Sequence, residues 1–276
     1  MSFVDLTKVI NNNNAEEKLS SISFASIDQS KWDKTPNNIF IENIVEIATE
    51  TESLGDIMKF KDAGINYQRV NVGLAQKGKS DLSSRLLYEG EKESDSHIQF
   101  WKGTDINEYY ISPITNRFCR PNIELASNER VILNADYFSI APKLIWRQTA
   151  PYPICTVDYD GVWFGRSIQA GIINPNYKNK ISYEYLCALL NSKYLRYLYE
   201  QNVKEGGRVF PQVKLEKLKP LPIVIPTDEQ KSEIEDLVTK TISATNSGDF
   251  DTAQILKANI DQKVFELYNV EPSNIV

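Results

Sequence analysis

The sequence predicts an α+β protein, with a β-rich body, supporting helices and a pair of antiparallel helices towards the C-terminal end. Three observations indicate this class. Short apolar runs alternate with Gly, Asn, Pro and Asp between residues 56 and 180, leucines recur at helical spacing over 182–201, and two amphipathic segments follow residue 227. With 41% hydrophobic and 25% charged residues, the 276-residue chain has the composition of a globular protein with an ample core.

Residues 1–55 differ in composition from the rest of the chain, and we expect a separate N-terminal helical or linker segment there. The stretch is polar and has four consecutive asparagines at 11–14. Between residues 36 and 52, apolar side chains recur at roughly helical spacing, which predicts a helix carrying Ile39, Ile41, Ile44, Val45 and Ile47 on one stripe.

The body, residues 56–226, is expected to consist of many short strands joined by loops. The apolar runs that predict them span residues 68–74, 109–111, 130–133, 143–147, 154–157 and 162–164. The sequence Asp158-Tyr159-Asp160-Gly161 is typical of a hairpin turn, so the last two strands are expected to form a hairpin. The tryptophans of the body are expected to fill its core; they are Trp101, Trp146 and Trp163.

Three helices are predicted in the rest of the chain. The first covers 182–201, with Ser182 as its N-cap and the glycine pair 206–207 beyond its end. After a strand at 220–226, one helix runs from 227 to about 245 and another from 251 to 268, joined by a turn at 246–249. Residues 227–276 should therefore form a helical hairpin, in which Ile234, Leu237, Val238 and Ile242 face Ile255, Ile260, Val264 and Leu267.

Charge is unevenly distributed along the chain. The net charge is −6, but residues 56–225 hold 23 Lys and Arg against 18 Asp and Glu, a local charge of +5. Because phosphate attraction is screened beyond about 10 Å, this local excess matters more than the total, and it favours a polyanionic partner for the body. A chance imbalance is the alternative.

Composition also predicts the compartment. No run approaches 18 apolar residues, and Met1–Ile10 lacks the apolar region of a signal peptide, so we expect no membrane segment and a cytoplasmic protein. The three cysteines are scattered without zinc-site spacing, as in a reducing compartment; they are Cys119, Cys155 and Cys187.

No motif of the chain predicts catalysis. The sequence Asn174-Pro175-Asn176-Tyr177 comes within one residue of the loop with which DNA-amino methyltransferases hold a flipped base, but no Gly-rich cofactor loop precedes it. The Asp/Glu-x-Lys triples of metal-dependent nucleases occur only in acidic, helical flanks, where they are usually solvated. The lone His97 lies in a very polar stretch typical of a surface. We therefore expect neither catalytic nor metal-binding residues.

Several side chains are instead of the types that read DNA. Arginine binds guanine and glutamine binds adenine through paired hydrogen bonds. The candidates for such contacts are Gln68 with Arg69, Arg147 with Gln148, Arg166 with Gln169, and Arg208 with Gln212. The candidate phosphate anchors are Lys77, Lys79, Lys102 and Lys214. The alternatives remain open: the arginines could be strand-edge charges, the lysines ordinary surface residues, and the glycine pair 206–207 a helix C-cap.

A family resemblance joins these segments. Gly64-Ile65-Asn66, residues 100–111 (FWKGTDINEYYI), 142–149 (PKLIWRQT), 189–193 (LLNSK), 206–214 (GGRVFPQVK) and 218–223 (LKPLPI) occur in the order of the TaqI-like C-terminal specificity domain, which the chain resembles over about residues 56–270. It also resembles, more distantly, half of a type I specificity subunit.

This resemblance implies a function. Such domains are the target-recognition modules of adenine-specific DNA methyltransferases and of type IIG restriction-modification enzymes, and they contact the duplex while a separate domain flips and methylates adenine. Residues 56–226 would be the DNA target-recognition domain, 1–55 the remnant of or junction to a methyltransferase domain, and 227–276 the helical hairpin. The implied partners are double-stranded DNA and a methyltransferase or endonuclease domain or subunit, and S-adenosylmethionine and magnesium would bind only there.

Two other hypotheses are retained. The chain could be a truncated N6-adenine methyltransferase or nuclease with residual activity, for instance through residues 174–177. It could also be mainly a protein-interaction subunit, in which the helices of 227–268 bind a partner.

Overall fold

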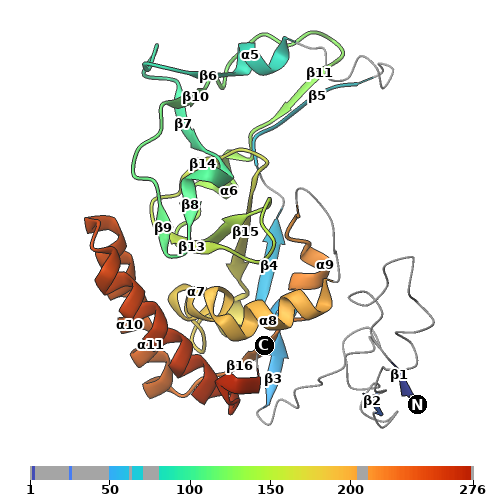
Figure 1. Ribbon diagram of the computed structural model, residues 1–276. Coiled ribbons are helices and arrows are strands. Elements are labelled where there is room, and N and C mark those ends of the chain that lie inside the picture. Colours follow the sequence, from blue (N-terminus) through green and yellow to red (C-terminus); the bar gives the residue numbers. More distant parts are fainter. Residues whose placement is uncertain are drawn as a thin grey trace, which may run out of the picture. The chain divides into compact units, whose positions relative to one another are not determined.

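The computed structural model describes residues 50–61, 64–70, 81–203 and 211–274, and the short strands Ser2–Phe3 (β1) and Ala25–Ser26 (β2) (Figure 1). The chain divides into two compact units, Met1–Ala48 and Thr49–Val276. In the first, β1 and β2 pair antiparallel. Most of the helix predicted at 36–52 lies outside the described residues, and at its end Thr51–Ser53 form strand β3 instead, because they pair with a later strand.

The centre of the second unit is a four-stranded antiparallel sheet. Its order is β13-β12-β15-β4, formed by Cys155–Asp158 (β13), Lys143–Arg147 (β12), Ile168–Ile173 (β15) and Met58–Lys61 (β4). Leu144, Ile145 and Trp146 of β12 are fully buried, since α7 packs on one face of the sheet and an apolar cluster lies on the other. Burial on both faces explains why this strand is continuously apolar rather than alternating.

A second sheet continues the body. Its order is β14-β7-β10-β6, formed by Trp163–Phe164 (β14), Ile98–Trp101 (β7), Arg117–Cys119 (β10) and Leu87–Glu89 (β6). Around it lie the strand pairs Asn66–Arg69 (β5) with Glu129–Ile132 (β11) and Ile106–Asn107 (β8) with Tyr110–Ile111 (β9), and the short helices Leu82–Leu86 (α5), Gly103–Asp105 (η2) and Ala135–Phe138 (α6).

The turn at Asp158–Gly161 forms, but the hairpin expected from it does not. Gly161 has a φ of 73°, and the Asp158 carboxylate accepts hydrogen bonds from the backbone of Asp160, Gly161 and Val162. Strand β14 nevertheless pairs in parallel with β7, because Trp163 stacks on Phe138 at 4.9 Å and directs the chain away from β13. The expectation of a β13–β14 hairpin was wrong.

The predicted helix over 182–201 is two helices. Tyr183–Asn191 (α7) begins after Ser182, whose hydroxyl accepts from the Tyr185 amide as expected of an N-cap, and Lys193–Asn202 (α8) follows. Between them, Ser192 is extended and buried, and its hydroxyl caps α8. The chain then forms Leu215–Leu218 (α9) and Pro222–Val224 (β16), which pairs with β3. The short helix Leu54–Ile57 (α3) joins β3 to β4, and Pro175–Tyr177 (η3) follows β15.

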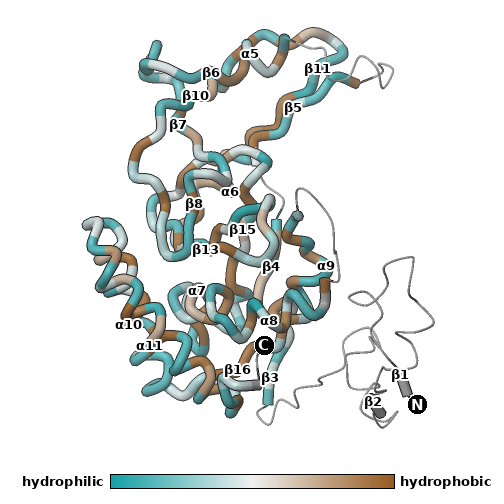
Figure 2. The backbone as a smooth tube through the Cα atoms, in the orientation of Figure 1, coloured by the Kyte–Doolittle hydropathy of each residue, from teal (hydrophilic) through white to brown (hydrophobic). Residues whose placement is uncertain are grey.

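The C-terminal helical hairpin is confirmed. Asp228–Ser247 (α10) begins with a capping box between Thr227 and Gln230 and ends at Gly248, which has a φ of 78°; Phe250–Tyr268 (α11) returns alongside it, followed by Pro272–Asn274 (η4). Most of the apolar residues expected between the helices are buried, but Ile255 is 64% exposed and does not face α10. In Figure 2 the central sheet and α7 are largely hydrophobic, whereas the hairpin is mixed.

The architecture agrees with the predicted α+β class: a β-rich body, supporting helices and a helical hairpin. Within the part of the chain that the structure describes, no helix combines the length and the apolar character needed to cross a bilayer.

Candidate nucleic-acid interface

Three segments that are distant in sequence meet where the central strand β12 ends. The Gln148 amide donates to the Ser167 carbonyl at 2.9 Å, and the Gln148 carbonyl accepts from the Val213 amide at 2.8 Å. A further antiparallel bridge joins Thr149 to Gln212. These bonds place five of the predicted DNA-contacting residues on adjoining backbone segments. We call this group the strand-end cluster: Arg147, Gln148, Arg166, Gln212 and Lys214.

Two glycines bring other backbone segments close to the cluster. A Cβ atom on Gly64 would lie 2.7 Å from the Arg166 amide nitrogen, and one on Gly103 would lie 2.8 Å from the Ser167 carbonyl oxygen. Such distances exclude any side chain unless the backbone moves. The Gly103 amide also donates to the Ser167 hydroxyl at 2.9 Å. The backbone next to Arg166 is therefore held from both sides, although the Arg166 side chain is exposed.

Arg147 is half-buried and partly engaged within the protein. Its guanidinium donates to the Ile106 carbonyl and to the Asn107 side-chain oxygen, both in β8. A guanidinium has five N–H donors, so these two bonds leave others for a ligand. Arg147 thus orients the β8–β9 turn as well as being a candidate for base contact.

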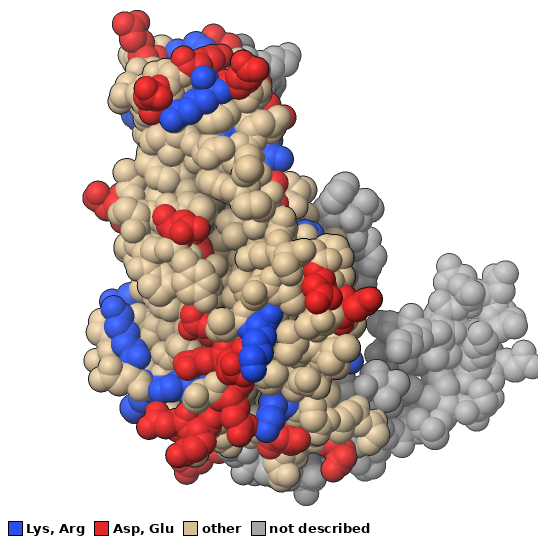
Figure 3. All heavy atoms as spheres, turned by 90° about the vertical axis from the view of Figure 1, so that its left-hand side faces the viewer, with Lys and Arg blue, Asp and Glu red and all other residues tan. Residues whose placement is uncertain are grey.

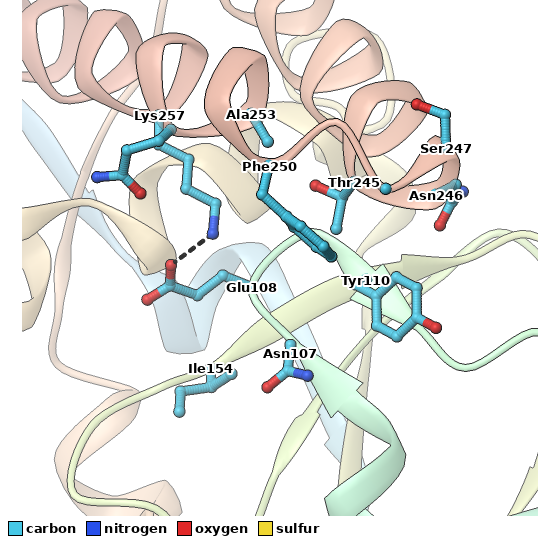
Figure 4. Close-up of a pocket in the computed structure, with 12 residues that line it drawn as sticks. Asn107, Glu108, Tyr110, Ile154, Thr245, Asn246, Ser247, Phe250, Ala253 and Lys257 are labelled. Atoms are coloured by element: carbon cyan, nitrogen blue, oxygen red, sulfur yellow. Dashed lines mark hydrogen bonds and ion pairs between the residues drawn. The ribbon is translucent and has the colours of Figure 1, made fainter.

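A cavity of about 690 Å³ lies on the other side of that turn, beneath the tip of the hairpin (Figure 4). Asn107, Glu108 and Tyr110 line it from the turn, and Phe250 and Lys257 line it from α11. Glu108 and Lys257 form an ion pair at 3.1 Å, drawn as a dashed line in Figure 4. Asn107 therefore lies both on the cavity wall and against Arg147 of the strand-end cluster.

The structure uses several predicted contact residues differently. Gln169 is only 5% exposed, and its side-chain oxygen accepts from the Trp146 indole at 2.9 Å, so it stabilises the core and is not available to a duplex. Lys102 pairs with Glu89 at 2.9 Å, and a phosphate would have to compete with that carboxylate. Lys77, Lys79 and Arg208 lie outside the described residues, as does the glycine pair 206–207.

The predicted pair Gln68 and Arg69 is split between the two faces of β5. Gln68 is exposed, whereas Arg69 is half-buried and opposite the buried Glu129 of β11, whose pKa its charge helps to lower. The residue that shares the face of Gln68 is Arg130, its direct partner in the strand register. Sequence reasoning missed Arg130, because the only signal for it is the pairing of β5 with β11, which joins residues about 60 positions apart.

Buried electrostatics stabilise the body rather than form a reactive site. Lys143 and Asp158 are fully buried and form an ion pair, and the Lys143 amine also donates to the Phe138 and Ile140 carbonyls. Burial lowers the pKa of the Lys143 amine, and the Asp158 charge opposes that shift. His97 is half-buried, with its ring nitrogen 2.8 Å from the Tyr88 hydroxyl. Among the described residues, no group of three or more His, Cys, Asp or Glu is placed to hold a metal ion.

Surface charge distinguishes the hairpin from the body. On the face drawn in Figure 3, acidic side chains gather over the lower part of the molecule, where α10 and α11 lie, with scattered Lys and Arg between them. A duplex would be repelled by such a surface. The hairpin side is therefore a poor candidate for DNA contact.

Comparison with known proteins finds a family match within the body. Residues 98–223 match the TaqI-like C-terminal specificity domain. The resemblance noted in the sequence is thus confirmed for the segment that contains β12, β15 and all five residues of the strand-end cluster. No curated protein matches the sequence.

Two of the solved structures that match the chain are as follows. One, from a study of complex assembly and conformational transition of a type I restriction-modification system, is 12% identical with a TM-score of 0.39, over 79% of this chain and 45% of that one. The other, the HsdS subunit from Thermoanaerobacter tengcongensis, is 14% identical with a TM-score of 0.39, over 87% of this chain and 49% of that one. The chain spans about half the length of the structures it matches.

Proposed function

We propose that this chain is the DNA sequence-recognition module of a restriction-modification system, and that it binds duplex DNA for a methyltransferase or endonuclease located elsewhere. The observation that carries the proposal is the strand-end cluster, in which Arg147-Gln148, Arg166 and Gln212 come together within a matched specificity domain. Arginine and glutamine are the side chains whose paired donors and acceptors distinguish guanine and adenine.

The proposal includes a division of labour. This chain recognises the DNA sequence, and S-adenosylmethionine and magnesium bind in the catalytic partner. The whole system is a cytoplasmic type IIG enzyme, in which the methyltransferase domain precedes the specificity domain. Asn174 supports the absence of a methylation loop here, since its amide donates to the Asp56 carbonyl and its backbone nitrogen to the Ile57 carbonyl. An asparagine engaged in this way is not placed to hold a flipped base.

A salt-titrated binding assay tests the proposal. The full chain is mixed with a pool of duplexes that carry a randomised core, at salt concentrations from about 50 to 200 mM. We expect one enriched sequence and an affinity that falls linearly on a logarithmic salt scale, with a slope of about −0.9 for each phosphate contacted. Binding without enrichment, or no binding, would contradict sequence recognition.

Two variants connect the assay to the cluster. Replacing Arg166 by alanine removes an exposed cation from the cluster, and we expect about tenfold or greater loss of affinity for the enriched sequence. Replacing Lys240 by alanine removes a cation from α10, and we expect no effect on DNA affinity.

Titration of the chain with S-adenosylmethionine in a calorimeter should show no heat of binding. Measurable binding would favour the hypothesis of a methyltransferase with residual activity.

A second function, binding of a protein partner through the hairpin, has its own supporting observation. Phe250 is 70% exposed at the edge of the cavity in Figure 4, and exposed aromatic side chains at a cavity are typical of protein contacts. Replacing Phe250 by alanine should weaken binding of the methyltransferase partner and leave DNA binding unchanged. A loss of DNA binding in this variant would contradict the separation of the two roles.

A further inference from the structure

Strands β5 and β11 form a two-stranded antiparallel ribbon with two different faces. The register pairs Asn66 with Ile132, Tyr67 with Val131, Gln68 with Arg130, and Arg69 with Glu129. The hydrogen bond from the Val70 amide to the Asn128 carbonyl, at 2.8 Å, extends the ribbon by one further pair. Because side chains alternate along a strand, Gln68 and Arg130 lie side by side on one face, and both are exposed.

The opposite face is fixed to the body. Tyr67 and Val131 pack against the apolar cluster, and the Tyr67 hydroxyl lies 2.9 Å from the Ser83 hydroxyl of α5. Glu129 is buried, and both its carboxylate oxygens accept from Arg85 of α5 at 2.6 Å. The contacts of the inner face therefore hold the ribbon against the body, and they fix the position of its outer face.

Arg130 differs from three other arginines of the body. Arg85 forms an ion pair with Glu129, and Arg120 forms one with Glu93. Arg117 forms ion pairs with both Asp105 and Glu89. Arg130 instead donates to the carbonyls of Ser127 and Glu129, at 3.1 and 2.7 Å, and no ion pair within the described residues includes it. Among the described residues it is therefore a cation without an ion-pair partner, and it lies beside the side-chain amide of Gln68.

The size of the ribbon fits a DNA groove. Neighbouring strands lie about 4.8 Å apart, and the major groove is about 12 Å wide, so a two-stranded ribbon with its side chains can enter it. Directly opposed Cβ atoms are about 5 Å apart, and neighbouring base pairs are about 3.4 Å apart. Two opposed side chains of the ribbon can therefore contact base pairs that are one or two steps apart. Ile132, on the same face and 49% exposed, is the kind of side chain that contacts a thymine methyl group.

We propose that the outer face of the β5–β11 ribbon is a second base-reading surface, in which Arg130 reads a guanine and Gln68 reads an adenine close to it in the major groove. This inference rests on the proposed function, since it presumes that the chain recognises DNA. It adds a reading element that is separate in sequence from the strand-end cluster, and it makes Arg130 a specificity-determining residue.

Sequence selection by variants tests the ribbon. The full chain and the variants Gln68→Ala, Arg130→Ala and Arg130→Lys are each used to select from duplexes with a randomised core, and their affinities for the wild-type sequence are measured. We expect Arg130→Ala to bind that sequence about 10- to 100-fold more weakly and to lose the guanine preference at one position. Gln68→Ala should relax a different position. Arg130→Lys should keep the salt dependence but weaken the guanine preference, since the lysine ammonium lacks the rigid planar fork of donors of a guanidinium.

Arg196→Ala, on α8, is the control for loss of an arginine away from the ribbon; Arg196 is half-buried and paired with Glu200, and the variant should select the wild-type sequence with unchanged affinity. If the wild-type chain enriches a sequence and all the ribbon variants enrich the same one with equal affinity, the ribbon proposal is wrong and the proposed function stands. If Arg130→Ala weakens all duplexes equally and lowers the salt slope by about one, Arg130 holds a phosphate and does not read a base. If the wild-type chain enriches nothing, both proposals fail.

Discussion

Lys143 and Asp158 form an ion pair in the interior of the body, where both side chains are fully buried. The pair joins the first residue of β12 to the last residue of β13, and Asp158 also holds the following turn through three backbone amides. The start of the central strand and the turn that leads to β14 are thus fixed by the same two charges. Their arrangement gives the first prediction.

Removal of one partner should destabilise the protein strongly. Replacing Lys143 by methionine leaves the Asp158 carboxylate buried without a cation, and such changes cost about 3–5 kcal/mol. The free energy of unfolding in urea measures this. The control is Lys193→Met, because Lys193 is 72% exposed in its pair with Asp261 and should contribute about 0–1 kcal/mol. Equal effects of the two changes would show that the interior pair has no special role.

Stability should depend on pH through Glu129. Hydrogen bonding from Arg85 lowers the pKa of the Glu129 carboxyl below its ordinary value of 4.5, with a further contribution from the Ala126 amide. A group with a lowered pKa in the folded state contributes stability above its unfolded pKa, and that contribution is lost as the pH falls through the folded value. The urea midpoint of the native chain should therefore exceed that of Glu129→Gln at pH 7, and the difference should shrink below about pH 4.5. A constant difference across this range would contradict the role of the ionised carboxylate.

The absence of a side chain at Gly64 should be required for the observed backbone position of Arg166 in the strand-end cluster. A methyl group there would lie 2.7 Å from the Arg166 amide nitrogen, so Gly64→Ala must shift backbone, at a cost of about 1–3 kcal/mol. Binding of the selected duplex should weaken in parallel. Gly165→Ala is the matched control, since its methyl group would lie no closer than 3.8 Å to a neighbour. If both variants bind and unfold like the native chain, the close approach is not required.

The cysteine thiols should be inert in the folded protein. All three are buried, and burial raises the pKa of the Cys119 thiol to about 12 and that of Cys155 well above its ordinary value. Since the thiolate is the reactive form, a water-soluble disulfide reagent at about pH 8 should label none of them until urea unfolds the chain. A chain with Ser247→Cys, at the exposed hairpin turn, should label at once. Rapid labelling of the native chain would show that a thiol is accessible.

Local signals predicted the elements whose cause is local. The turn at 246–249 and the periodicity of apolar residues located both helices of the hairpin, and the structure adds the capping box of Thr227 and Gln230 at the start of α10. The continuous apolar run of β12 located the strand with its observed ends. The break at Ser192 was missed, because a serine within a helical pattern is compatible with continuation until tertiary packing makes it a cap.

The candidate site was predicted in part. Residue type identified Arg147, Gln148, Arg166 and Gln212, and the fold brings their backbone segments together. Residue type also selected Gln169, which the Trp146 indole holds in the core, and it missed Arg130, which only the pairing of β5 with β11 places beside Gln68. Composition does not show which polar side chain satisfies a buried donor and which remains on the surface.

The sequence alone determined the class of fold, the regions of the four longest helices and of seven of the sixteen described strands, and the resemblance of the body to a specificity domain, because propensity, capping and apolar periodicity act over a few residues. The tertiary structure decided which strands pair, which polar side chains are buried, and which distant segments meet at the end of β12. Those features depend on contacts between residues far apart in the chain, and hydrogen-bond satisfaction and packing across such contacts select one arrangement among many that have the same local pattern.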